Sequence, residues 1–104
     1  MNELTGLEIC VRIAEIEGIT YHFEIGDTND CYIYSEQLNK EFNPIAKTET
    51  GKALCFDLMV KHDIKLSRNR SGEFVAMNNQ YLIKVTQDPQ VAICLAIIET
   101  PKEQ

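Results

Sequence analysis

The sequence lacks an apolar run long enough to cross a membrane. Its longest uninterrupted run, Val91–Ile98, has eight residues, whereas a membrane-spanning helix needs about 20. The first residues, Met1-Asn2-Glu3, also lack the basic patch that begins a signal peptide, and no apolar stretch follows them. We therefore expect a cytosolic protein with no membrane partner.

Motifs that carry catalysis or hold phosphates are missing as well. The chain has no G-x-S-x-G elbow, no phosphate-binding loop, no G-x-G-x-x-G and no H-E-x-x-H, and its five glycines stand singly. Cys31 and His22 could pair across a hairpin as nucleophile and base, but no third residue to orient them is evident. We expect no enzymatic activity and no cofactor.

Closely spaced metal ligands are also absent. None of the four cysteines has a second cysteine two to four residues away, and the two histidines are isolated. Asp27 and Asp30 are suggestive of a calcium loop, yet Tyr32 and Leu38 occupy the positions where that loop needs glycine and glutamate. We expect no metal site. We expect the side chains of three cysteines to be buried, each inside a helix: Cys10, Cys55 and Cys94.

Basic residues are scarce in the first third of the chain. The net charge is −6, and residues 1–39 hold eight acidic residues but a single basic one, Arg12. Direct binding of nucleic acid needs a broad basic surface, so this chain is a poor candidate for it. An acidic surface attracts basic partners instead, including proteins that themselves bind nucleic acid. The only basic cluster consists of Lys61, Lys65, Arg68 and Arg70.

The length of 104 residues, with 44% apolar and 25% charged residues, predicts one globular domain over residues 1–104. Thr5 and Glu8 are spaced as a capping box and Gly18 as a stop, which predicts a helix over 5–17. Asp88-Pro89 begins another helix that ends near Glu99. A third helix is predicted over 49–62, and strands over 19–25, 31–34, 64–66, 74–77 and 81–85.

The predicted fold class is therefore α+β, a layered sandwich of three helices and about five mostly antiparallel strands in the order αββαβββα. The run of apolar residues Val91–Ile98 predicts that the last helix lies in the middle of the packing. The helix over 49–62 is apolar around most of its circumference, which predicts burial from more than one side, with Asp57 and Lys61 at its exposed edge. Asn78-Asn79 favours a tight type I′ hairpin turn.

Each predicted helix places a cysteine between aliphatic or aromatic neighbours. The spacings between Cys10, Cys55 and Cys94 are unequal, and the intervening strands do not match in sequence. We interpret this similarity as convergent core packing and not as a solenoid repeat. Four of the aromatic residues fall on the first predicted hairpin, and packing of one sheet face against a helix is the favoured explanation for them. These residues are Tyr21, Phe23, Tyr32 and Tyr34.

The segment from Asp88 to Glu99 resembles the C-terminal helix of small bacteriophage and prophage proteins with the phage ABA-sandwich domain. Phe42-Asn43-Pro44 is similar to the aromatic-Asn-Pro loop of that family, and Ala53–Ile64 is similar to the helix that follows it. Gly72–Ala76 stands where the family usually has a strand with tryptophan, although this chain has no tryptophan. The resemblance implies a three-layer α/β/α arrangement and an accessory role in a phage or prophage, but it transfers no catalytic residue.

Three functional hypotheses follow. The first is a non-enzymatic inhibitor of a host anti-phage defence protein, such as a nucleic-acid-binding CRISPR effector, in the host cytosol. Its predicted contact residues are Glu15, Glu17, Glu24, Asp27, Asp30 and Glu36. The second is a sponge that sequesters a nucleotide immune signal, with Tyr32 and Tyr34 stacking on the base and Arg68 and Arg70 holding phosphate. The third is a structural or regulatory phage protein. The oligomeric state stays open, with a homodimer as one alternative.

Overall fold

The computed structural model describes residues 4–100, so the N-terminal residues considered for a signal peptide lie outside it. Within this range the chain forms three helices and six antiparallel strands, which confirms the α+β class. The additional strand is the two-residue β3, inside a segment expected to be a loop. The elements in chain order are α1 (Gly6–Glu17), β1 (His22–Ile25), β2 (Cys31–Ser35), β3 (Lys40–Glu41), α2 (Glu49–Lys61), β4 (Lys65–Arg68), β5 (Phe74–Met77), β6 (Ile83–Thr86) and α3 (Pro89–Ile98).

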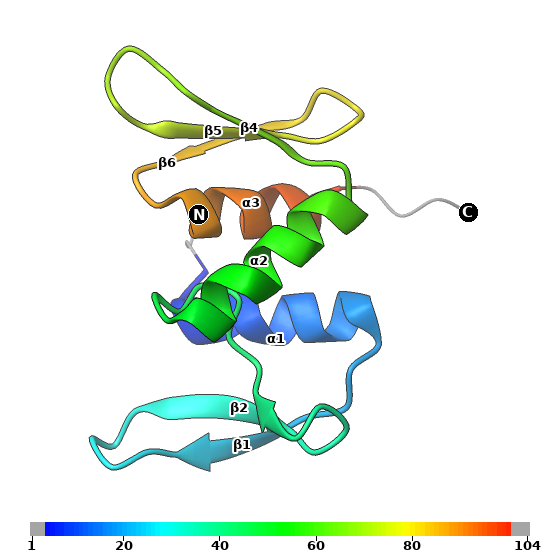
Figure 1. Cartoon of the computed structure of the whole chain (residues 1–104), viewed down its shortest axis with the longest axis vertical. Helices are drawn as coiled ribbons and strands as arrows, with labels where there is room; N and C mark the ends of the chain where they lie inside the picture. Colours follow the sequence, from blue (N-terminus) through cyan, green and yellow to red (C-terminus); the bar gives the residue numbers. More distant parts are fainter. Residues whose placement is uncertain (1–3, 101–104) are drawn as a thin grey trace.

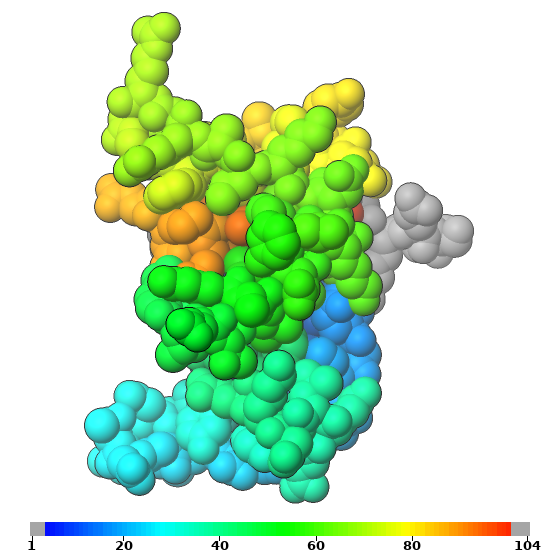
Figure 2. Space-filling view, viewed as in Figure 1, coloured from blue at the N-terminus to red at the C-terminus, as the bar shows by residue number. Residues whose placement is uncertain are grey.

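The helices lie between two three-stranded sheets (Figure 1). Sheet A, in the order β1-β2-β3, packs on α1, and sheet B, in the order β4-β5-β6, packs on α3. The α/β/α layering implied by the family resemblance is therefore not observed, because here the sheets form the two outer layers. In Figure 2, residues 22–41 form one end of the molecule and residues 65–86 form the opposite end.

The helix ends follow the local sequence signals. Thr5 accepts a hydrogen bond from the amide of Glu8, whose carboxylate accepts one from the amide of Thr5, so the predicted capping box is present. Gly18 ends α1 in the left-handed conformation at φ 69°. Asp88 caps α3, with Pro89 at its first position. These interactions are local, which is why the sequence predicts them.

The central position predicted for α3 is confirmed. Six of its ten residues are buried, and it contacts α1, α2 and sheet B. The prediction for α2 is only partly right, because α2 packs on α3 along one side alone. Gly51, Cys55 and Leu58 are buried there, whereas Phe56 and Val60 are 58% and 63% exposed. Within residues 4–100 no helix is long and apolar enough to cross a membrane.

The segments that follow α1 and α2 have the same topology, although their sequences differ. Each is a meander of three antiparallel strands. In the first turns, 26–30 and 69–73, the amide of the first residue donates to the carbonyl of the fifth, at 2.8 and 2.9 Å. The fourth residue is left-handed in both, as Asn29 (φ 64°) and Gly72 (φ 83°). The two meanders cover opposite sides of the helices, so they do not form a solenoid.

The turn predicted at Asn78-Asn79 is wrong in type. Met77 pairs with Ile83, so the connection between β5 and β6 has five residues, and its left-handed residue is Tyr81 (φ 66°). The reason is the buried Asn78 side chain, whose Oδ1 accepts hydrogen bonds from the amides of Gln80 and Leu82. A side chain that replaces backbone partners in this way supports a wider loop.

Candidate functional site

The solvent-facing side of sheet A gathers acidic and aromatic side chains. Glu24 is paired with Tyr32, and Tyr34 is paired with both His22 and Glu41. Because directly paired residues of an antiparallel sheet share a face, these side chains form one surface. Ile33, on the other face, is buried against α1. We call the surface the outer face of sheet A; its residues are His22, Glu24, Tyr32 and Tyr34, with Glu41 at its edge, where the carboxylate accepts a hydrogen bond from Asn43 near the start of α2.

Hydrogen bonds order this face around Glu24. Its carboxylate accepts from the hydroxyl of Tyr32 at 3.1 Å and lies 2.7 Å from Nε2 of His22. The hydrogen bonds with His22 and Tyr32 lower the pKa of Glu24 below its usual value. The bond to Glu24 in turn raises the pKa of Tyr32. The face therefore presents the Glu24 carboxylate beside the neutral hydroxyl of Tyr32 at neutral pH.

Three more of the predicted acidic residues lie at the ends of this sheet. Asp27 and Asp30 are exposed in the turn between β1 and β2, and Glu36 is exposed in the turn between β2 and β3. Asp30 accepts a hydrogen bond from the hydroxyl of Thr28 at 2.6 Å. Glu15 is exposed on α1, where it accepts from the hydroxyl of Tyr21. Its place on a helix separates it from the outer face.

Glu17 has a different setting from the other predicted contact residues. Its side chain is only 10% exposed, and its oxygens lie 2.6 Å from Nζ of Lys61 and 2.7 Å from Nε2 of His62. Burial raises the pKa of Glu17, but the hydrogen bonds with Lys61 and His62 outweigh it and lower the pKa below the usual value. This carboxylate joins the ends of α1 and α2, so it has little surface left for a partner.

The structure does not bring the four predicted sponge residues together within one chain. Tyr32 and Tyr34 lie on sheet A, whereas Arg68 ends β4 of sheet B and Arg70 follows in the next turn, across the helical layer (Figure 1). Arg68 lies over the ring of Phe74, 5.0 Å from its centroid. The prediction that the aromatic residues of the first hairpin pack against a helix is also only partly met, since Tyr32 and Tyr34 face away from the helices.

The structure separates the two residues considered as a nucleophile–base pair. His22 lies on the outer face of sheet A, but Cys31 is paired with Ile25 on the opposite face, so the two cannot act as a nucleophile–base pair. No group of three histidine, cysteine or acidic residues among residues 4–100 is placed to hold a metal ion. Cys10, Cys55 and Cys94 are buried free thiols, as predicted, and Cys31 is exposed.

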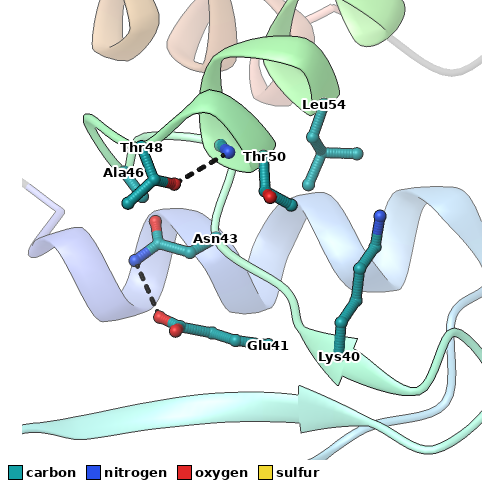
Figure 3. A pocket seen from close by; sticks show the side chains of 8 residues that line it. Lys40, Glu41, Asn43, Ala46, Thr48, Thr50 and Leu54 are labelled. Atoms are coloured by element: carbon teal, nitrogen blue, oxygen red, sulfur yellow. Dashed lines mark hydrogen bonds between the residues drawn. The ribbon is translucent and has the colours of Figure 1, made fainter.

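A hollow of about 280 Å³ lies between β3 and the first turn of α2 (Figure 3). Figure 3 shows Lys40 and Glu41 on one side of it and Thr48 and Thr50 on the other. Asn43 donates to Glu41 at 3.2 Å, and the hydroxyl of Thr48 accepts from the amide of Gly51. These polar groups serve the local loop, and the volume is slightly below the roughly 300 Å³ at which small-molecule sites begin.

Sequence reasoning missed two residues of the outer face. Glu41 falls in none of the predicted strands, because β3 has only two residues and gives no alternating pattern. His22 appears among the sequence predictions only as a base for Cys31, although its position between Tyr21 and Phe23 in an alternating segment fixes its face. That alternation was the available signal for His22. None existed for Glu41.

No family model matches the chain, and comparison with curated proteins and with solved structures found no match either. The resemblance to phage ABA-sandwich proteins therefore stays a prediction.

Proposed function

We propose that the protein is a non-enzymatic binding protein that attaches to a basic partner through the outer face of sheet A and its acidic turns. The supporting observation is the concentration of Glu24, Asp27 and Asp30 around two outward-facing tyrosines, with Glu41 at the edge of the face.

The chemistry of the face suits arginine-rich surfaces. Carboxylates form charge-assisted hydrogen bonds with guanidinium groups, and a tyrosine ring beside them can stack on the guanidinium plane. Tyrosine also contributes much contact area at low entropic cost, which is why it is common in interface hot spots. Charge of one sign over a whole face accelerates encounter with a partner of the opposite sign.

The phage context of this proposal rests on the family resemblance. A small acidic protein made by a phage can act by occupying, one to one, the basic surface on which a host defence protein holds nucleic acid. An anti-CRISPR-like inhibitor in the host cytosol is the specific form that we propose. Such an inhibitor acts by binding alone, without a cofactor or a catalysed reaction.

The test compares two double variants that change the net charge equally. Asp27→Lys/Asp30→Lys alters the acidic turn of sheet A, and Glu49→Lys/Asp57→Lys alters exposed positions of α2. Host proteins captured on the immobilised wild-type protein are identified, and the affinity of the captured protein is then measured at low and high salt. We expect the first variant to bind at least about tenfold more weakly and with less dependence on salt, and the second to bind as the wild type does.

The proposal would be overturned if both variants bound like the wild type, or if binding to the captured protein did not change with salt. Competition supplies a second criterion. If the partner is a nucleic-acid-binding protein, added DNA or RNA should displace the protein from it. Simultaneous binding of both ligands would show that the face does not occupy the nucleic-acid surface.

A further inference from the structure

β1 is an edge strand, and its free edge exposes unpaired backbone groups. The amide of Gly26 donates to the carbonyl of Asp30, which fixes the hydrogen-bonded pairs of the ladder. Because these pairs alternate in an antiparallel ladder, Glu24 and His22 form the next ones with β2. The amides and carbonyls of Phe23 and Ile25 consequently point away from β2, toward the open edge of the sheet.

The side chain of Phe23 forms one wall of a groove beside α1, and the side chain of Ile25 is exposed next to it on the same face of β1. Phe23 and Ile25 lie on the inner face of sheet A, yet they are 57% and 72% exposed, because β1 extends beyond the flank of α1. A groove of about 320 Å³ separates Phe23 from α1. Its apolar lining from α1 consists of Leu7 and Val11, and its polar rim consists of Glu8, Arg12 and Glu15.

The combination of a free strand edge with an adjacent apolar groove is the geometry used for β-strand addition. An extended peptide at such an edge gains main-chain hydrogen bonds, and every second side chain enters the groove. The exposed Phe56 and Val60, by contrast, lie on a helix, whose backbone groups are already paired.

Charge decides which peptide fits. Pairing β1 with β1 of a second copy would bring two acidic regions together, because residues 1–39 of each copy carry eight acidic residues and one basic residue. Glu24, Asp27 and Asp30 of both copies would lie near the joint, and like charges at close range are unfavourable. A strand with lysine or arginine on its solvent-facing side would instead meet these carboxylates favourably.

We propose that β1 binds an extended basic segment of the partner as a fourth, antiparallel strand of sheet A. The residues that pair with Phe23 and Ile25 are apolar: the one opposite Phe23 enters the groove beside Leu7 and Val11, and the one opposite Ile25 covers that exposed side chain. The residues between them are arginine or lysine and face Glu24. This inference rests on the proposed function for the basic character of the partner, and it adds the conformation and side-chain pattern of the bound segment.

The test uses a short acetylated and amidated peptide that alternates arginine with valine, with binding measured by titration calorimetry. Two N-methylated versions separate the edges of the peptide. Methylation of valine amides, which would face β1, should weaken binding at least about tenfold, whereas methylation of arginine amides, which would face solvent, should have little effect. A peptide with its valines and arginines in two separate blocks should also bind weakly.

Protein variants test the same contact from the other side. Ile25→Pro removes an amide that faces the open edge and takes no part in the ladder with β2, and Ile25→Ala removes the same side chain but keeps that amide. We expect the proline variant to bind the peptide at least about fivefold more weakly than the alanine variant. Circular dichroism checks that both are folded, and the methylated peptides give an answer that is independent of the variants.

The outcomes distinguish this inference from the proposed function. If both methylated peptides bind alike while Asp27→Lys/Asp30→Lys weakens peptide binding, strand addition is wrong and the acidic face still recognises basic ligands. If that charge reversal also has no effect, the proposed function fails too. A concentration-dependent dimer that Ile25→Pro dissociates would show that a second copy occupies the edge, and it would overturn the proposal.

Discussion

The four cysteines differ sharply in their surroundings. Burial is the largest cause that raises the pKa of Cys10, to about 11, and the hydrogen bond with Cys55, together with burial, raises the pKa of Cys94. A protonated, buried thiol reacts slowly. We expect a thiol-reactive dye to label only Cys31 rapidly in the native protein, and all four cysteines after denaturation. In a Cys31→Ser variant, rapid labelling should vanish; its persistence would contradict the burial of the other three.

Substitutions at Cys94 test the core directly, because this side chain has no exposed surface. Cys94→Ala removes one sulfur and should lower the free energy of unfolding by about 1 kcal/mol. Cys94→Asp would bury an unpaired charge among aliphatic neighbours, so this variant should be unfolded or insoluble. Urea denaturation measures the first effect and solubility the second. A soluble Cys94→Asp protein with wild-type circular dichroism would argue against the position of α3.

Glu17 makes the stability depend on pH. Its pKa is lower in the folded protein than in the unfolded chain, so its contribution is complete above the unfolded value near 4.5 and disappears as the pH falls through the folded value. Glu17→Gln should lower the free energy of unfolding by about 1–3 kcal/mol at pH 7. The difference between the two proteins should shrink below pH 4. Urea titrations at several pH values measure it, and a constant difference would mean that the charge is unimportant.

At the scale of elements, the first turn of α2 needs a glycine at position 51 because the backbone of Ala46 leaves no space for a side chain. A Cβ at Gly51 would lie 2.5 Å from the carbonyl oxygen of Ala46. Gly51→Ala should therefore destabilise the protein by about 1–3 kcal/mol, although alanine is the better helix former by about 1 kcal/mol. Gly6→Ala is the matched control, because its Cβ would meet only the flexible end of Ile45 at 3.2 Å. Equal unfolding midpoints for both variants would refute this packing.

Short elements also show where propensity stops being informative. The sequence predicts α1 and α3 well, because their caps lie within four residues of the amides that they bind. β3 escapes prediction because it exists only through pairing with β2. The exposure of Phe56 and Val60 on α2 could not be predicted, because the pattern of apolar residues does not show how many other elements pack against a helix.

At the scale of the whole molecule, Gln90 joins the two halves of the chain. Its side chain is buried in α3, and its amide donates to the carbonyls of Pro44 and Ala46 at 2.9 and 2.7 Å. Gln90→Met would leave both carbonyls without this donor and should lower the free energy of unfolding by about 2–4 kcal/mol. Gln87→Met, at an exposed position before α3, should have no measurable effect. Chemical denaturation of both variants checks the contrast, and similar stabilities would contradict it.

The sequence by itself determined the class of the fold, the order of the elements apart from β3, and the burial of three cysteines. Capping residues, strand alternation and the apolar run Val91–Ile98 of α3 are patterns of neighbouring positions, so they can be recognised along the chain. The acidic character of the first third is likewise a property of composition. The prediction that this acidity attracts a basic partner follows from it and awaits the binding experiments.

Only the tertiary structure decided the layering and the membership of the candidate sites. It placed the sheets outside the helices, separated the tyrosines from Arg68 and Arg70, and engaged Glu17 between α1 and α2. Strand alternation divides side chains into two sets but does not say which set a helix will cover. That choice depends on contacts between residues far apart in the chain, such as Ile33 with α1, and the groove beside β1 exists only because α1 leaves that edge uncovered.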